Sequence, residues 1–259
     1  MKKILLALAA VPLLFLFIWT AFPASSMQSI IEDSLTGANI TGEVRGLKKG
    51  LFYTVSIDSV VLKNSGEELI SFESIRSRIN PFGLITMRLD ASVSGRTALG
   101  EILGGAILTK TGLQARLDYK GIDMRELRFL RRTGIRGTGT ISGRLLLTDG
   151  RGRAEFATTN AVFEPADFSG VTVPMNFFDA VAGALSIEGS AIEVASVALT
   201  GKDIYARLKG VIRNGVPDLT MELMPGRSFA ENPLFIAQLD KYKVSPGYYV
   251  IPVRGNFSL

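Results

Sequence analysis

The sequence predicts a mainly β protein, with an N-terminal transmembrane helix followed by a curled, mostly antiparallel sheet and a few short helices. Two observations lead to this fold class. An uncharged run of nineteen residues, Ile4 to Phe22, directly follows Lys2 and Lys3. Beyond it, short segments of alternating apolar and polar residues recur roughly every 8–15 residues, separated by Gly, Asn or Asp. Strands without intervening crossover helices favour antiparallel pairing over a parallel βαβ sheet.

The uncharged run is long enough to cross a bilayer. A helix rises about 1.5 Å per residue, so this run spans roughly the hydrocarbon core. Trp19 stands near its far end, where aromatic residues favour the membrane–water interface. We expect residues 1–23 to form a cytoplasmic tip and anchor, and residues 24–259 a periplasmic β-rich domain. The anchor positions that we single out are Ile4, Leu8, Leu13, Phe17, Trp19 and Phe22.

The charges around the anchor predict its orientation. Lys2 and Lys3 hold the N-terminus in the cytoplasm, which predicts a single-pass protein of the bacterial inner membrane with its bulk in the periplasm. A cleaved signal peptide is the alternative. Its positive start would fit, but its apolar core would exceed about 7–15 residues, and a cut after Ala24 would place Phe22 where a small residue is needed. A retained anchor is favoured, and cleavage stays open.

The first part of the domain reads as one short helix followed by strands. Ile30, Ile31 and Leu35 form the apolar stripe of a helix at residues 26–36. Asn80 to Gly83 has the composition of a turn. Alternation of apolar and polar residues predicts strands at residues 51–62, 84–93 and 113–120.

A single helix is expected to interrupt the strands at residues 124–132. Asp123 and Glu126 have the spacing of a capping box, and Ile122 and Leu127 occupy the two positions of a hydrophobic staple. A cluster of basic residues on this helix is a candidate interaction surface, although a solvated helix face is the plainer interpretation. The cluster consists of Arg125, Arg128, Arg131 and Arg132.

The remainder is again mainly strands. We expect a helical turn at residues 176–183, and Asn232 followed by Pro233 predicts a helix to Tyr242. A final strand is expected at residues 248–257. The other predicted strands are 139–148, 153–159, 171–174, 184–188, 191–199, 204–212 and 219–223.

Composition excludes most catalytic chemistry. The chain has no cysteine and no histidine, so thiol nucleophiles, Ser-His-Asp triads and thiolate or imidazole metal sites are ruled out. We assign no catalytic residue, cofactor site or metal ligand. Two of the 29 basic residues precede the anchor, and the others nearly balance the 24 acids. This balance does not indicate nucleic-acid binding, which requires a clustered basic face.

Several features together resemble a known family. They are the single N-terminal anchor, the helix closed by Leu35-Thr36-Gly37, the run Gly42-Glu-Val-Arg-Gly46, and the ending Tyr249-Val-Ile-Pro-Val-Arg-Gly255. Glycine-punctuated strands such as 184–189 and 204–210 lie between them. In these respects the chain resembles the type II secretion system protein N (GspN) family, which is itself similar to AsmA-like envelope proteins. The motifs are diffuse but extend over nearly the whole chain.

The resemblance implies two functions that stay open at this point. The secretion-system interpretation implies a non-enzymatic component that binds other secretion-system subunits. The AsmA-like interpretation implies a curved sheet whose apolar groove handles lipid, with phospholipid as the ligand. The chain is much shorter than the long lipid-bridging members, which favours an accessory or adaptor role. Alternation alone does not decide whether the apolar face is a packed core or a lipid groove.

Overall fold

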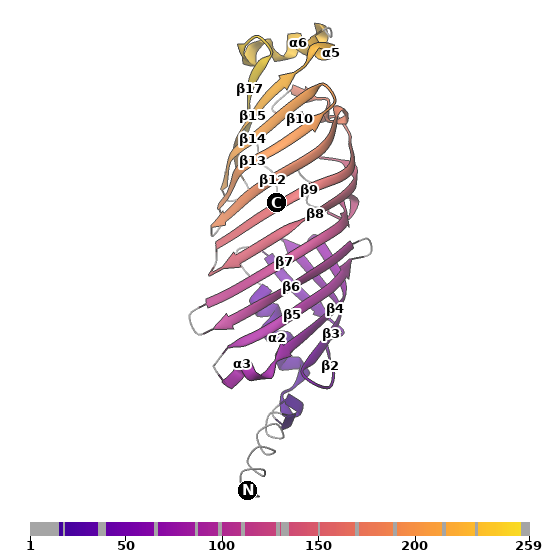
Figure 1. Cartoon of the computed structure of the whole chain (residues 1–259), viewed down its shortest axis with the longest axis vertical. Coiled ribbons are helices and arrows are strands. Elements are labelled where there is room, and N and C mark those ends of the chain that lie inside the picture. The colour runs from indigo at the N-terminus through magenta and orange to yellow at the C-terminus, as the bar shows by residue number, and fades with distance from the viewer. Residues whose placement is uncertain are drawn as a thin grey trace, which may run out of the picture. The chain divides into compact units, whose positions relative to one another are not determined.

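A computed structural model describes most of the chain after residue 15 (Figure 1). The protein is mainly β, as predicted. The described residues are 16–17, 19–35, 40–64, 67–85, 88–97, 100–109, 112–127, 130, 135–149, 151–168, 171–188, 191–213, 216–230 and 233–254.

Fifteen strands form one large antiparallel sheet. Those of the first part are β1 (Ile40–Arg45), β2 (Lys48–Lys49), β3 (Thr54–Asn64), β4 (Glu67–Asn80), β5 (Leu89–Thr97), β6 (Gly100–Thr109) and β7 (Gly112–Asp123). Those of the second part are β8 (Gly137–Thr148), β9 (Arg151–Phe163), β12 (Phe178–Glu188), β13 (Ala191–Gly201), β14 (Ile204–Arg213), β15 (Val216–Pro225), β16 (Lys243–Ser245) and β17 (Tyr248–Arg254). A separate two-stranded sheet contains β10 (Ala166–Phe168) and β11 (Val171–Val173).

The order of strands in the sheet nearly follows their order in the chain. Most strands pair with the one before and the one after, and β10 and β11 form an excursion between β9 and β12. The order begins at β1 and ends at β16, and these described edge strands do not pair with each other. The sheet is therefore open, and the expectation of a curled sheet was wrong. Hairpin connections explain the order, because successive antiparallel strands need only short turns.

Helices are few and short in the described part of the chain. The α-helices are α2 (Ala24–Leu35), α3 (Pro81–Ile85), α5 (Arg227–Ala230) and α6 (Pro233–Leu239). Single 3₁₀ turns are η1 (Met124–Glu126), η2 (Met175–Phe177) and η3 (Asp240–Tyr242). No helix among these residues is long and apolar enough to span a membrane. Most of the predicted anchor, including Ile4, Leu8 and Leu13, lies outside the described residues.

Three predicted elements differ from the structure. Residues 84–93 were expected to be one strand, but α3 occupies residues up to Ile85 and β5 begins at Leu89. The reason is the end of β4: Asn80 Oδ1 accepts from the Phe82 N–H at 3.1 Å and Pro81 follows, so the chain starts a helix here. Residues 176–183 are mostly the start of β12 instead of a helical turn. The helix expected from residue 124 begins instead as the 3₁₀ turn η1, which ends at Leu127.

The chain divides into two compact units, each with its own core. Unit 1 comprises Met1–Ala98 and Ile102–Leu113, and unit 2 comprises Leu99–Glu101 and Gln114–Leu259. In unit 1, α2 packs on the sheet formed by β1, β3 and β4. The buried side chains of this core are Trp19, Val44, Val55, Ile57 and Val60. A Cβ added at Gly42 would overlap Leu35, so a glycine here lets α2 approach β1 closely.

The core of unit 2 lies towards β14, β15 and β17, where α5 and α6 also lie in Figure 1. Alternate strand residues such as Ala206, Leu223 and Ile251 are fully buried. Leu239 of α6 and Val173 of β11 are fully buried as well and belong to the same cluster. The helical C-terminal part and the β10–β11 excursion therefore bury this end of the sheet.

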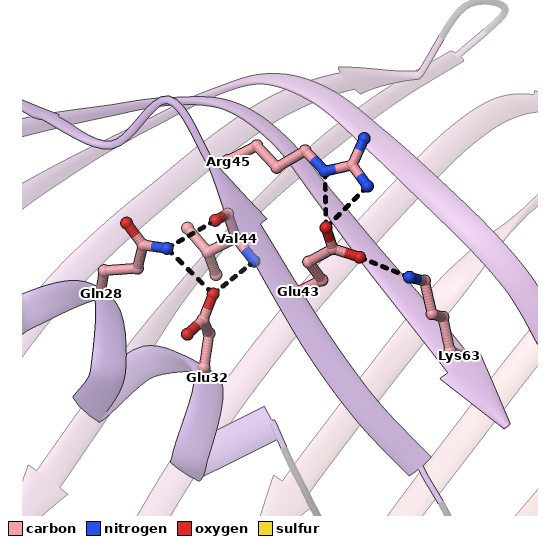
Figure 2. A network of polar contacts seen from close by, with 6 residues as sticks. All are labelled: Gln28, Glu32, Glu43, Val44, Arg45 and Lys63. Carbon is pink, nitrogen blue, oxygen red and sulfur yellow. Dashed lines mark hydrogen bonds and ion pairs between the residues drawn. The ribbon is translucent and has the colours of Figure 1, made fainter. Parts of the chain in front are cut away.

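At the edge of unit 1, two side chains of α2 form hydrogen bonds with main-chain groups of the edge strand β1 (Figure 2). Glu32 Oε1 accepts from the Val44 N–H at 2.9 Å, and Gln28 Nε2 donates to the Val44 carbonyl at 2.8 Å. Gln28 also donates to Glu32 at 3.1 Å. Val44 is only 2% exposed, so these groups would otherwise be buried without partners. The two side chains take the place that a further strand would need.

Replacing Glu32 by Ala is expected to lower the free energy of unfolding by about 1–3 kcal/mol, because the buried Val44 N–H loses its acceptor. Glu32→Gln should retain most of the stability, since its amide oxygen can still accept. Asp33→Ala is the matched control, because Asp33 is exposed on the same helix. Urea denaturation of the three variants measures the difference. Equal losses for Glu32→Ala and Asp33→Ala would contradict the contact.

Candidate functional site

The candidate functional site is a face of the unit 2 sheet, formed by twelve residues of β7, β8, β9 and β12. Side chains of a strand point alternately to the two faces, so paired strands build rows on each face. Three such rows follow from the strand register: Ala115, Leu147, Gly152 and Ile187; Leu117, Leu145, Ala154 and Leu185; and Tyr119, Gly143, Phe156 and Gly183. We call these residues the apolar face.

All twelve residues of the apolar face are half-buried. The same rows continue into β13, β14 and β15, and some of their members there are buried: Leu185 pairs with Val194, which belongs to the unit 2 core. Leu117, Leu145 and Phe156 are neither members of that core nor packed against it. Leu185 of β12 does pack against that core, so the part of the apolar face that lies outside the described core is its β7, β8 and β9 part.

Glycines let aromatic rings lie flat on the apolar face. A Cβ at Gly183 would lie 2.9 Å from the Phe156 ring and 2.7 Å from Val197. A Cβ at Gly143 would overlap the Tyr119 ring, whose hydroxyl reaches across to donate to the Glu155 carbonyl at 3.3 Å. Burial raises the pKa of the Tyr119 hydroxyl, so it remains a neutral donor. The result is an apolar surface formed by rings and aliphatic side chains.

The opposite face of the same strands is charged. Arg144 donates to Asp118 across β7 and β8 at 2.6 Å, and Arg116 donates to the same carboxylate at 3.0 Å. These contacts, Arg144 first, hold the pKa of Asp118 below its ordinary value. Arg153 and Glu155 form a further exposed ion pair at 3.1 Å. Exposed pairs of this kind contribute little to stability, so this face is suited mainly to solvation.

Leu145 and Leu146 show the contrast within one strand. Leu145 lies in the middle row of the apolar face, whereas Leu146 points to the charged face, where it is 41% exposed and pairs with Arg153 in β9. A lone exposed leucine among charges is ordinary. A continuous half-exposed apolar surface over four strands is typical of a site that binds an apolar partner.

The arginine cluster predicted on a helix at residues 124–132 is only partly described. Arg128, Arg131 and Arg132 lie outside the described residues. Arg125 lies in the 3₁₀ turn η1, which follows β7 directly. Its guanidinium donates to Asp123 at 2.6 Å, and its backbone N–H donates to the same carboxylate at 2.8 Å. Asp123 is thus the cap of this turn, and Arg125 is engaged in holding it.

Of the positions predicted for the anchor, Phe17, Trp19 and Phe22 are described. Phe17 and Phe22 are exposed, whereas Trp19 is buried in the unit 1 core.

The described positions also contain no cluster of three His, Cys, Asp or Glu residues that could hold a metal ion. The acidic groups with lowered pKa values, such as Glu222 beside Lys209, are held by individual basic partners.

The comparisons with known proteins found no counterpart. No protein-family model matches the sequence, and no curated protein and no solved structure matches it either. The resemblance to secretion-system and AsmA-like proteins therefore depends on the quoted sequence features alone.

Sequence alternation indicated parts of the apolar face, since Leu113, Ala115, Leu117 and Tyr119 alternate with polar residues. It did not indicate which side chains of different strands form rows, because register depends on the turns and bulges between strands. It also did not indicate the hydrogen bonds from Gln28 and Glu32 to the main chain of Val44. Gln28 and Glu32 stand four apart on a helix, and this spacing is a signal that could have marked one polar face next to the first strand.

Asp123 is expected to make stability depend on acid pH. Its pKa is lowered by the Arg125 side chain first, although burial opposes this. A carboxyl whose folded pKa is depressed stabilises above its unfolded pKa of about 4, and this contribution is lost as pH falls through the folded value. Asp123→Asn keeps an oxygen acceptor for the Arg125 N–H but removes the charge. It should cost about 1 kcal/mol at neutral pH and less in acid.

Urea midpoints measured from neutral to acid pH would test this dependence. Asp149→Asn serves as the control, because Asp149 is exposed in a turn with a left-handed backbone (φ 51°) that Asn also tolerates. If the urea midpoints of the wild type and of Asp123→Asn differ by the same amount at every pH, the charge of Asp123 does not have this role.

Proposed function

We propose that this protein is a non-enzymatic, inner-membrane-anchored periplasmic component of a type II secretion system, which acts by protein–protein contacts. Residues 1–23 are its anchor in this proposal, with Lys2 and Lys3 on the cytoplasmic side. The observation that carries the binding role is the half-buried apolar face of unit 2. The family resemblance supplies the type of partner.

Contact through a face is favoured over strand addition at the β1 edge. A protein that adds a strand needs free main-chain groups at an edge. At Val44 both groups are held by Gln28 and Glu32, so a strand arriving there would have to displace two hydrogen bonds. The last strand, β16, has three residues, which offers little length for pairing. The apolar face has no such obstacle.

A second candidate function uses the same face for lipid. Leu117, Leu145 and Phe156 present aliphatic and aromatic carbon without a charged neighbour in their rows. Acyl chains could cover this surface as well as a protein partner could, because burial of apolar area does not depend on the type of partner. This candidate is an AsmA-like lipid-binding or lipid-transfer protein whose ligand is a phospholipid.

Native mass spectrometry of the full-length protein, gently extracted from its own membrane, distinguishes the two candidates. We expect secretion-system subunits at fixed stoichiometry. Bound phospholipid without protein partners would support the second candidate and count against the first. Deleting the gene provides an independent check, since unchanged secretion of all exported proteins would also count against the first.

A pair of neighbouring substitutions tests whether the apolar face is the contact. Leu145→Gln places an amide in the middle row and should weaken capture of the bound partner about tenfold, since burying one Leu contributes about 1.5–3 kcal/mol. Leu146→Gln, on the charged face of the same strand, should leave capture unchanged. Quantitative co-purification from membranes measures both. Equal capture by the two variants would place the contact elsewhere.

A further inference from the structure

One end of unit 1 presents large apolar side chains to solvent. Leu51 and Phe52 lie in the turn before β3 and are 74% and 72% exposed, and Phe82 of α3 is 74% exposed. The turn is strained, because Phe52 and Tyr53 have φ values of 54° and 60°, in the left-handed region that glycine favours. Backbone strain of this kind is concentrated at functional sites, and here it keeps an aromatic side chain exposed to water.

Phe52 and Phe82 border an open hollow of about 480 Å³. Phe52 and Phe82 stand on its rim with Pro81, and Arg78 is part of its lining. Asp90 is the one acidic residue among the described lining residues. The end of the unit therefore combines exposed rings with a guanidinium group.

Arginines and hydroxyl groups lie on the sheet face beside this hollow. Arg78 pairs with Thr54 on one side and Ser92 on the other, and it also lines a second hollow of about 470 Å³. Arg76 pairs in the same way with Ser56 and Ser94. No ion pair within the described chain engages either guanidinium. The neighbouring hydroxyl groups donate to main-chain carbonyls, for example Ser92 to Arg78 and Ser94 to Arg76. The donors left for phosphate oxygens are the two guanidinium groups, whose geometry suits them.

The same end of unit 1 is attached to the segment that we expect to enter the membrane. Trp19 Nε1 donates to the Gly50 carbonyl at 3.0 Å, one residue before Leu51. Lys49 donates to the carbonyls of Trp19 and Phe22, and its ammonium lies 4.9 Å from the centre of the Trp19 ring. Trp19 also contacts Tyr53 with the ring centroids 5.1 Å apart. The exposed turn is thus fixed to the last residues of the predicted anchor.

We propose that this end of unit 1 docks onto the phospholipid surface of the membrane from which the chain emerges. Leu51, Phe52 and Phe82 insert among the headgroups. Arg76 and Arg78 bind lipid phosphates. The proposal rests on the anchor part of the proposed function and adds a specific lipid contact to it. Exposed aromatic and aliphatic side chains next to basic residues are the composition that binds membrane interfaces.

Single cysteines for a fluorescent label test the docking, because the chain contains no cysteine of its own. Full-length Leu51→Cys and Phe82→Cys proteins would be labelled with NBD and reconstituted into vesicles of phosphatidylethanolamine and phosphatidylglycerol. Some of the lipid would carry a nitroxide quencher. Glu73→Cys is the control in the same unit: it is exposed and lies seven residues before Asn80 on β4, about 23 Å along the strand.

We expect blue-shifted emission and strong quenching at positions 51 and 82, and neither at position 73. Adding Arg76→Gln and Arg78→Gln to the Phe82→Cys protein should reduce quenching at position 82, because the phosphate contacts are lost. Asp58→Asn, an exposed charge change in β3, should not reduce it.

Flotation of the vesicles tests the membrane anchor separately from the docking of unit 1. Protein that floats with the vesicles but shows equal, water-like emission at positions 51, 73 and 82 would overturn the docking and leave the anchor intact. Protein that does not float would overturn the anchor and the docking with it. Neither result bears on secretion-system partners, which mass spectrometry identifies separately.

Discussion

The structure depends above all on main-chain pairing between successive antiparallel strands. Each pairing fixes a register, and each register determines which side chains stand in one row. The apolar rows of β7, β8, β9 and β12, and the charged rows behind them, both follow from this ladder. A single sheet has two faces but needs only one for its core. Any apolar area that the helices and excursions do not cover must remain at the surface or meet a partner.

The two units bury the apolar side of the sheet with different segments. Unit 1 uses α2 and Trp19, which pack on β1, β3 and β4. Unit 2 uses C-terminal helices and the β10–β11 excursion, and these gather on the part of the sheet that contains β14, β15 and β17. The apolar face is what the second arrangement leaves half-buried. The proposed binding role is therefore a consequence of where the covering segments end.

Much of the fold could be predicted from alternation and turn residues. Strands such as β7, β8 and β14 were expected within a few residues of their observed bounds, because period-two patterns and glycines mark them clearly. The helix α3 was missed because Asn80 and Pro81 cap a helix as readily as they form a turn. The apolar face and the exposed turn at Phe52 were not predictable, since cross-strand register and left-handed backbone at an aromatic residue leave no local sequence signal.

The nearly sequential strand order has a consequence for how the chain acquires its structure. Most strands pair with the segment that was made just before them, so few contacts must wait for distant parts of the chain. Short loop closures are entropically inexpensive and fast. A chain that emerges N-terminus first can therefore add one hairpin at a time. The hydrogen bonds from Gln28 and Glu32 to Val44 of β1 would form early. The sheet would then grow only from β1 towards the later strands.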